Sequence, residues 1–147
     1  MRKFYVCKGF EDRGVIIPKR ATAYSAGYDF TTLDEVDINP GEKAMVMTGL
    51  KAQMEKDDVL LVFPRSSLAV KKGLRLANSV AVIDADYFSN PTNDGHIMIN
   101  LFNFSKSKVH LEKGERFAQG IFVKYLTVDD DESDGTRSGG YGSTGVK

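Results

Sequence analysis

Two aspartates, Asp84 and Asp86, stand at or just beyond the end of an apolar run at residues 79–83. Their i, i+2 spacing places both carboxylates on one side of the chain if the extended conformation continues. A carboxylate at the end of a buried strand can orient and deprotonate a water molecule within hydrogen-bonding distance. The same pair could instead close a turn by accepting backbone N–H groups. Asp29, two residues after Gly27, is a third candidate acid. The alternative is again a turn residue.

A second candidate site begins at Arg65. Ser66 or Ser67 can cap a short helix that continues through residues 68–72 and ends at Gly73. Backbone N–H groups at a helix start, a serine hydroxyl and a guanidinium together attract anions. A simple capped turn that carries a surface arginine is the alternative explanation.

Other common site types find no support in the sequence. His96 and His110 have no Cys or His at metal-ligand spacing, which argues against a structural zinc site. The local motifs contain no Ser-His-Asp arrangement. The glycines near the C-terminus neither follow a strand nor open a helix, so neither the dinucleotide nor the P-loop fingerprint applies.

Length and composition fit one globular domain. The 147 residues are 41% apolar and 27% charged, and 20 basic residues balance 20 acidic ones. A neutral chain argues against a protein that coats nucleic acid. Without a long apolar run or a secretory signal, no membrane association is expected. The single cysteine, Cys7, suits a reducing compartment, so a cytoplasmic location is expected.

The balanced charge hides a difference between two parts of the chain. Residues 129–147 hold five acids, two bases and five glycines, whereas residues 1–128 hold 18 bases and 15 acids. A slightly basic body suits a small anionic ligand. The C-terminal part cannot bury a core of its own. We therefore expect a β-domain at 1–128 and a flexible arm at 129–147, the alternative for the arm being a disordered solubilising tail.

The elements that must position these residues are short strands. Runs rich in Val, Ile, Phe and Tyr alternate with turn residues such as Asn39-Pro40-Gly41, which is typical of an all-β sandwich or barrel. The expected strands are residues 2–8, 14–18, 36–38, 43–54, 58–64, 74–77, 79–83, 95–104, 109–111 and 117–126.

Two of these strands are apolar on both faces, at residues 59–63 and 97–104. In so small a sandwich one face of each should be exposed. A subunit interface would cover it, so an oligomer is expected.

Taken in order, five segments resemble the trimeric dUTPase family (deoxyuridine 5'-triphosphate nucleotidohydrolases). The resemblance covers about residues 22–146, and its specificity comes from all five segments occurring in order at plausible spacing. They are Ala26-Gly27-Tyr28-Asp29-Phe30, Pro64-Arg65-Ser66-Ser67-Leu68-Ala69, Val82-Ile83-Asp84-Ala85-Asp86-Tyr87, Gly114-Glu115-Arg116-Phe117-Ala118-Gln119 and Arg137-Ser138-Gly139-Gly140-Tyr141-Gly142-Ser143-Thr144-Gly145.

The resemblance implies a jelly-roll-like β-fold, a homotrimer with shared active sites, and hydrolysis of dUTP to dUMP and pyrophosphate with Mg²⁺. Asp84 would orient the attacking water, and Asp29 would help to hold hydrated Mg²⁺. Contacts to uracil and deoxyribose are implied for Asn78, Val82, Ile83, Tyr87 and Tyr141. Contacts to phosphate are implied for Arg65, Ser66, Ser67, Gln119, Arg137, Ser143 and Thr144.

The sequence departs from the family pattern at residues 79–83, the hairpin that the resemblance implies would bind uracil, and beyond it. Ala81 stands where a glycine is common. Residues 88–96 form a longer turn than in many relatives, interpreted as a surface excursion to which the sequence assigns no role. Two alternative functions stay open. One is a dCTP deaminase-like enzyme, and the other is a nucleotide-gated regulatory protein of the same fold.

Overall fold

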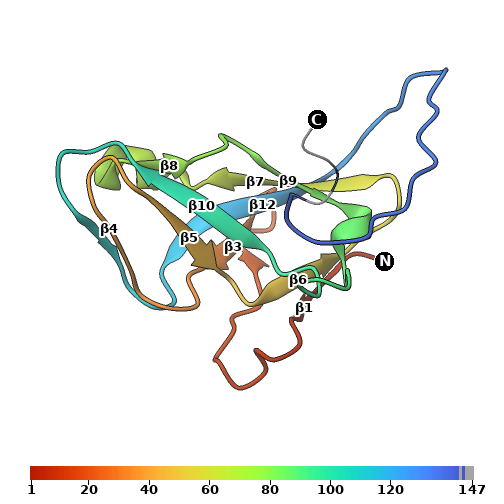
Figure 1. Cartoon of the computed structure of the whole chain (residues 1–147). Helices are drawn as coiled ribbons and strands as arrows, with labels where there is room; N and C mark the ends of the chain where they lie inside the picture. The colour runs from red at the N-terminus through yellow and green to blue at the C-terminus, as the bar shows by residue number, and fades with distance from the viewer. Residues whose placement is uncertain (143, 145–147) are drawn as a thin grey trace.

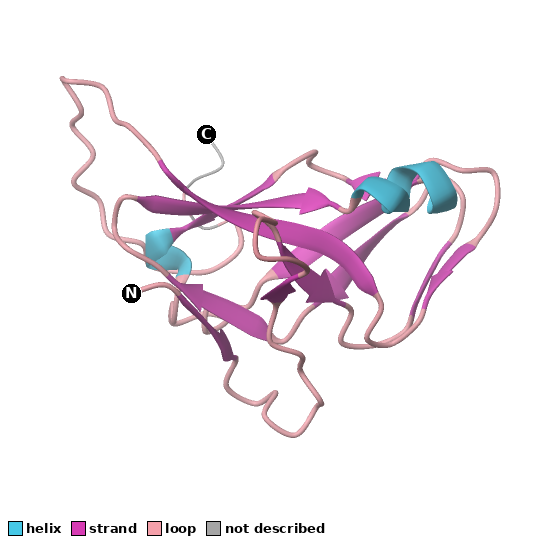
Figure 2. Cartoon of the chain, turned by 180° about the vertical axis from the view of Figure 1, so that it is seen from behind, coloured by secondary structure: helices cyan, strands magenta, loops and turns pink. Residues whose placement is uncertain are grey.

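The structure is a computed structural model that describes residues 1–142 and Thr144. Its elements are almost all strands (Figures 1 and 2). The strands are β1 (Lys3–Val6), β2 (Lys19–Arg20), β3 (Tyr28–Thr31), β4 (Val36–Ile38), β5 (Lys43–Met47), β6 (Leu50–Gln53), β7 (Asp58–Pro64), β8 (Leu74–Leu76), β9 (Ala81–Asp84), β10 (Met98–Asn103), β11 (Val109–Leu111) and β12 (Arg116–Lys124). Two short helical segments, η1 (Leu68–Lys72) and η2 (Ala85–Tyr87), complete the fold.

The largest sheet has the strand order β2-β3-β12-β7-β9, with the long strand β12 at its centre. A second sheet has the order β5-β10-β8, and the pairs β1-β6 and β4-β11 extend the two layers (Figure 1). The jelly-roll-like all-β fold is therefore confirmed. Among the described residues the sheets stay open and do not close into a barrel.

The core lies between these layers and follows the two-residue periodicity of the strands. Leu60 and Val62 of β7 are fully buried, as are Ile99 and Leu101 of β10. Phe30 of β3 joins them in the same apolar cluster. The alternate residues of β7 and β10 are only half-buried.

The expected strand at residues 43–54 is in fact two strands, because the chain bends at Thr48 and Gly49. Gly49 has a φ of 72°, which favours glycine over residues with a side chain. Buried groups hold the bend: the Thr48 hydroxyl donates to the Ile97 carbonyl (2.7 Å), and the Gly49 N–H donates to His96 Nε2 (2.9 Å). Long-range hydrogen bonds of this kind cannot be deduced from local periodicity.

One expectation about the N-terminal third was wrong, since residues 14–18 form no strand. The segment Tyr28–Thr31 is strand β3 inside the main sheet, which excludes the alternative of a turn at Asp29. Pairing with β12 on one side and β2 on the other stabilises β3 despite its short length. Asp29 is therefore a strand residue.

The helix expected after Arg65 is a single π-helical turn. Gly73 ends it with a φ of 67°, as expected. Ser67 occupies the N-cap position but makes no side-chain capping hydrogen bond, so the expected serine cap is wrong. Neither described helical segment is long and apolar enough to cross a membrane.

Candidate active site

The turn between β8 and β9 frames the first part of the site. A hairpin was expected here, but β8 pairs with β10 and β9 pairs with β7, so the turn joins two different sheets. This β8–β9 turn includes Ser79 at a φ of 68°, and the Val80 N–H donates to the Asn78 carbonyl (2.8 Å). Beside it lies a cavity of about 330 Å³. Its lining includes the expected uracil and sugar residues Asn78, Val82, Ile83, Tyr87 and Tyr141.

Asp84 ends β9 at the rim of this cavity. The chain then enters η2, so the extended conformation does not continue to Asp86 as the i, i+2 argument required. The two carboxylates nevertheless face one partner. Arg137 donates from Nη2 to Asp84 and from Nε to Asp86, both at 2.7 Å, and its side chain is only 8% exposed. The arm thus returns to the end of β9 in its own chain (Figure 1).

Tyr87 forms the floor of the site and is 6% exposed. Its hydroxyl donates to the His96 carbonyl and accepts from Asn93 Nδ2, both at 2.8 Å. Burial raises the pKa of the Tyr87 phenol, so the hydroxyl stays protonated at neutral pH. The Arg137 guanidinium lies 5.6 Å from the centre of the ring.

The glycine-rich arm closes one side of the cavity. Tyr141, Gly142 and Thr144 line it, although Tyr141 is still 58% exposed. Thr144 also lines an adjoining cavity of about 510 Å³. Ser143, expected near the phosphates, lies outside the described residues.

A second part of the site surrounds Asp29 on β3. Arg65 Nε lies 3.6 Å from one Asp29 oxygen, and Arg116 Nη1 lies 3.4 Å from the other. Gln119 of β12 is the residue directly opposite Asp29 in the sheet. A Cβ on Gly27 would lie 2.4 Å from Gln119 Oε1, so a side chain there would have to displace the Gln119 amide. Three expected site residues therefore meet here: Asp29, Arg65 and Gln119.

The two serines after Arg65 lie beside this cluster. Ser66 is exposed and Ser67 is half-buried. Lys72, at the end of η1, pairs with Glu115 at 2.8 Å and so ties the turn to the start of β12. This ion pair fixes the position of the serines relative to Gln119.

The two parts of the site lie at opposite ends of β7. Asp84 pairs with Val59 at the start of this strand, whereas Arg65 directly follows Pro64 at its end. Six residues of extended chain span about 20 Å. The backbone of Asp84 and that of Arg65 are therefore well separated within one chain.

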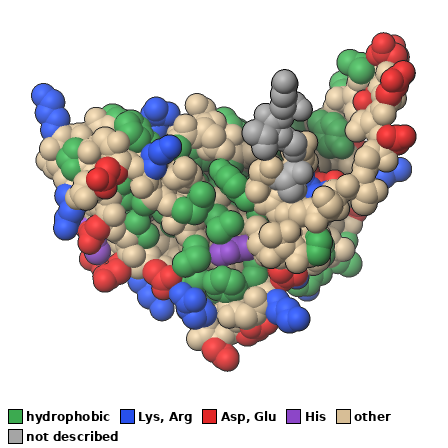
Figure 3. All heavy atoms as spheres, viewed as in Figure 1, with side chains coloured by type: hydrophobic (Ala, Val, Ile, Leu, Met, Phe, Trp, Pro, Cys, Tyr) green, Lys and Arg blue, Asp and Glu red, His purple; other side chains and the backbone are tan. Residues whose placement is uncertain are grey.

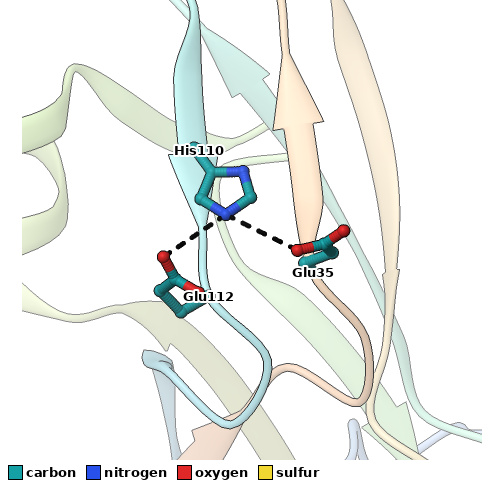
Figure 4. Close-up of side chains that lie close together, drawn as sticks. All are labelled: Glu35, His110 and Glu112. Atoms are coloured by element: carbon teal, nitrogen blue, oxygen red, sulfur yellow. Dashed lines mark ion pairs between the residues drawn. The ribbon is translucent and has the colours of Figure 1, made fainter.

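Three side chains in another part of the molecule lie close enough together to hold a metal ion. Their spacing in the sequence did not indicate this cluster. His110 Nε2 lies 3.5 Å from Glu112 and 3.9 Å from Glu35, on β11 and just before β4 (Figure 4). All three side chains are exposed, and His110 Nδ1 is 2.7 Å from Asp37. These strands lie at the end of the molecule away from η2 (Figure 1). The cluster is therefore separate from the cavity beside the β8–β9 turn.

Sequence reasoning missed two residues at the site. Arg116 lies in a segment that was recognised, but only the sheet shows that it faces Asp29. Asn93 lies in the turn to which the sequence assigned no role, and it donates a hydrogen bond to Tyr87. That turn is not a simple surface excursion, since Asn90 and His96 within it are buried. The number of polar residues in the turn was the one available signal.

Comparisons with known proteins agree with this geometry. The family model described as dUTPase matches residues 13–145. A deoxyuridine 5'-triphosphate nucleotidohydrolase of Lactococcus lactis subsp. lactis is 47% identical and covers 99% of both chains. A protein of that name from Rickettsia felis is 38% identical over 95% of both chains.

Solved structures show the same fold. A dUTPase from Streptococcus mutans aligns with a TM-score of 0.81 and 44% identity, over 86% of this chain and 98% of that one. A mutant dUTPase from phage phi11 of S. aureus, described for the coordination of a structural Mg(II) ion, aligns at 0.74 with 19% identity, over 92% of this chain and 97% of that one. The second likeness concerns the fold alone.

Fold and site together define an all-β, nucleotide-hydrolysing enzyme. More narrowly, the chain belongs to the dUTPase family, the enzymes that hydrolyse dUTP to dUMP and pyrophosphate.

Proposed function

We propose that the cavity beside the β8–β9 turn binds deoxyuridine and that Asp84 activates the water that cleaves dUTP. The observation that carries this proposal is the position of Asp84 at the rim of a cavity whose floor is Tyr87. The buried Tyr87 ring leaves no room for a 2′-hydroxyl beneath the sugar. Asn78 and the backbone of Val82 and Ile83 would read the uracil edge. Unpaired buried groups opposite a wrong base cost about 1–3 kcal/mol each.

In the proposed reaction a water oxygen attacks the α-phosphorus while its proton passes to the Asp84 carboxylate. The bond from the α-phosphorus to the bridging oxygen of the β-phosphate breaks, and pyrophosphate leaves with that electron pair. Arg137 pairs with Asp84 and Asp86. The phosphates compete for this guanidinium, and its departure frees Asp84 to accept the proton.

The cluster around Asp29 is proposed to bind the phosphate chain. Arg65, Arg116 and Gln119 supply donors, with Ser66 and Ser67 beside them. Bound Mg²⁺ would neutralise phosphate charge and polarise its oxygens. Asp29 suits such an ion, because Mg²⁺ takes one or two carboxylates together with phosphates and water. Asp29 would hold the hydrated ion through water.

A trimer with shared active sites is proposed to bring the two halves together. Asp84 and Arg65 are about 20 Å apart in one chain, so a complete site needs residues from more than one copy. Hydrophobic side chains gather over β5 and β10 (Figure 3), where Met45 and Met47 are 42% and 36% exposed. This face supports the subunit contact, because apolar patches of this kind mark interfaces.

The arm at residues 129–147 is proposed to close over the bound nucleotide. Tyr141 would stack on uracil, which is worth about 1–3 kcal/mol by analogy with base–aromatic contacts. Arg137, Ser143 and Thr144 would approach the phosphates. Closure would exclude water from the reacting centre.

The location proposed for the enzyme is the cytoplasm. Burial raises the pKa of the Cys7 thiol to about 12, so this group stays protonated and is a poor nucleophile at neutral pH.

Pyrophosphate release with Mg²⁺, compared among dUTP, dCTP, dTTP and UTP, tests the proposed function. Release from dUTP alone is expected. Release from dTTP at a similar rate would show that the cavity lined by Ala81 admits a C5 methyl group. Ammonia from dCTP would favour the deaminase alternative. Nucleotide binding without any product would favour the regulatory alternative.

A further inference from the structure

The turn at residues 88–96 presents one side chain, Asn93, to two parts of the site. Its Nδ2 donates to the Tyr87 hydroxyl at 2.8 Å. Its Oδ1 accepts from Asn90 Nδ2 (2.8 Å) and from the Gly95 N–H (3.1 Å). Bonds at both ends of the amide hold it in one orientation.

Gly140 of the arm lies against the flat face of that amide. A Cβ on Gly140 would be 2.8 Å from Cγ, Nδ2 and Oδ1 of Asn93 alike. Equal distances to these three atoms place the Cβ directly over the amide plane. Gly139 and Gly140 are buried, although Ser138 and Tyr141 beside them are exposed. The arm is thus seated here by a residue without a side chain.

The turn cannot easily move away from the arm. Asp94 pairs with Lys51 of β6 at 2.8 Å and accepts the Lys8 N–H at 2.8 Å. Gly95 has a φ of 83°, and a Cβ there would lie 2.7 Å from the Tyr87 carbonyl. Ionic and backbone contacts therefore fix the turn to β1, β6 and η2.

We propose that Asn93 is a positioning residue that couples the orientation of Tyr87 to the docking of the arm. One amide holds the tyrosine that faces the sugar and also forms the seat for Gly140. Its effect on dUTP rests on the proposed function, but the seat itself does not. Losing the seat lowers the population of the closed arm and so weakens apparent substrate affinity.

Gly140→Ala tests the seat, with Gly135→Ala as the matched control. Gly135 also lies in the arm, but a Cβ there meets nothing within 4 Å, and neither glycine has a positive φ. The first measurement needs no nucleotide: tryptic cleavage after Arg137, followed as release of the peptide 138–147. Because docked Arg137 is 8% exposed, we expect cleavage at least five times faster in Gly140→Ala than in wild type or Gly135→Ala. Equal rates would overturn the seat.

Asn93→Ala provides a second test of the seat, because it removes the three atoms that a Cβ on residue 140 would meet. In that background Gly140→Ala should add no further increase in cleavage rate or KM. Independent, multiplying effects of the two substitutions would contradict the contact. In the Asn93 wild-type background Gly140→Ala should raise KM for dUTP about tenfold and change kcat less than threefold.

The tyrosine half of the proposal has its own readout. Asn93→Ala should lower the preference for dUTP over UTP several-fold, whereas Gly140→Ala should leave it unchanged. Asn93→Asp keeps the size and acceptor of the side chain and replaces the donor to Tyr87 by a carboxylate oxygen, so it should lose preference without speeding tryptic cleavage. An unchanged preference in both Asn93 variants would overturn this half. Absence of dUTP hydrolysis in wild type would reject the proposed function alone, since the protease comparison would still decide the seat.

Discussion

At the residue scale, Asp84 has competing partners. Its carboxylate is paired with Arg137, whereas the proposed hydrolysis requires it to accept a proton from water. A long phosphate chain is the stronger partner for a guanidinium, because it offers several charged oxygens. Substrate binding is thus expected to release the catalytic carboxylate.

Asp84→Asn should remove the proton acceptor while keeping the size of the side chain. We expect the rate of pyrophosphate release to fall by about 10²–10⁴-fold. The affinity for a non-hydrolysable dUTP analogue, measured by calorimetry, should change far less. Asp134→Asn in the exposed arm serves as the control. Full activity in Asp84→Asn would reject the assigned role.

At the element scale, strand β12 organises the site, because it pairs with β3 on one side and β7 on the other. Gln119 and Arg116 both belong to it. The strand passes its neighbours closely at Gly120, where a Cβ would lie 2.6 Å from the Phe30 ring and 3.0 Å from Leu60. Packing at this glycine holds the phosphate residues in register.

Gly120→Ala should therefore destabilise the fold through overpacking, by about 1–3 kcal/mol. The midpoint of thermal unfolding should fall by several degrees, as measured by circular dichroism. Gly135→Ala, which meets open space, should leave the midpoint unchanged. A Gly120→Ala midpoint equal to wild type would show that the sheet relaxes around the methyl group.

The β4-β11 pair should give stability a pH dependence. A hydrogen bond from His110 to Asp37, supported by the charges of Glu112 and Glu35, raises the His110 pKa from 6.5, and Lys108 also approaches Asp37. Folded His110 binds its proton more tightly than the unfolded chain does. Its contribution is therefore complete below about pH 6.5 and is lost as pH rises through the raised pKa.

His110→Gln should accordingly lower the melting temperature more at pH 6 than at pH 9. The measurement is thermal unfolding of both proteins at the two pH values. A difference that is constant with pH would mean that the histidine contributes by packing rather than by charge.

At the scale of the whole molecule, the proposed mechanism needs both Asp84 and Arg65, and their separation along β7 makes assembly a condition for the proposed activity. The apolar face over β5 and β10 is where that assembly is expected (Figure 3). A charge placed there would have to be buried without a partner, which is strongly unfavourable.

Met45→Glu should therefore convert the proposed trimer into smaller species, as measured by light scattering. Hydrolysis of dUTP should fall with it, because no complete site remains, while circular dichroism stays unchanged. Val70→Glu, on an 86% exposed residue of η1 beside two lysines, is the control that should keep both mass and activity. A fully active monomer would contradict the shared site.

The sequence by itself determined the all-β class, the family and the order of the five segments, because these depend on local periodicity and residue identity. It placed β4 and β7 correctly, where turn residues mark the ends of short apolar runs. It could not show the bend at Gly49 or the role of Asn93. These depend on hydrogen bonds between groups distant along the chain.

Only the tertiary structure decided which site residues meet. Asp29 faces Arg65 because β3 and β7 both pair with β12, and Asp84 lies at the other end of β7 because β9 runs antiparallel to it. The same structure brings Arg137, 53 residues farther along the chain, to within 2.7 Å of Asp84. Strand pairing and arm docking set these distances, and no spacing within one segment encodes them.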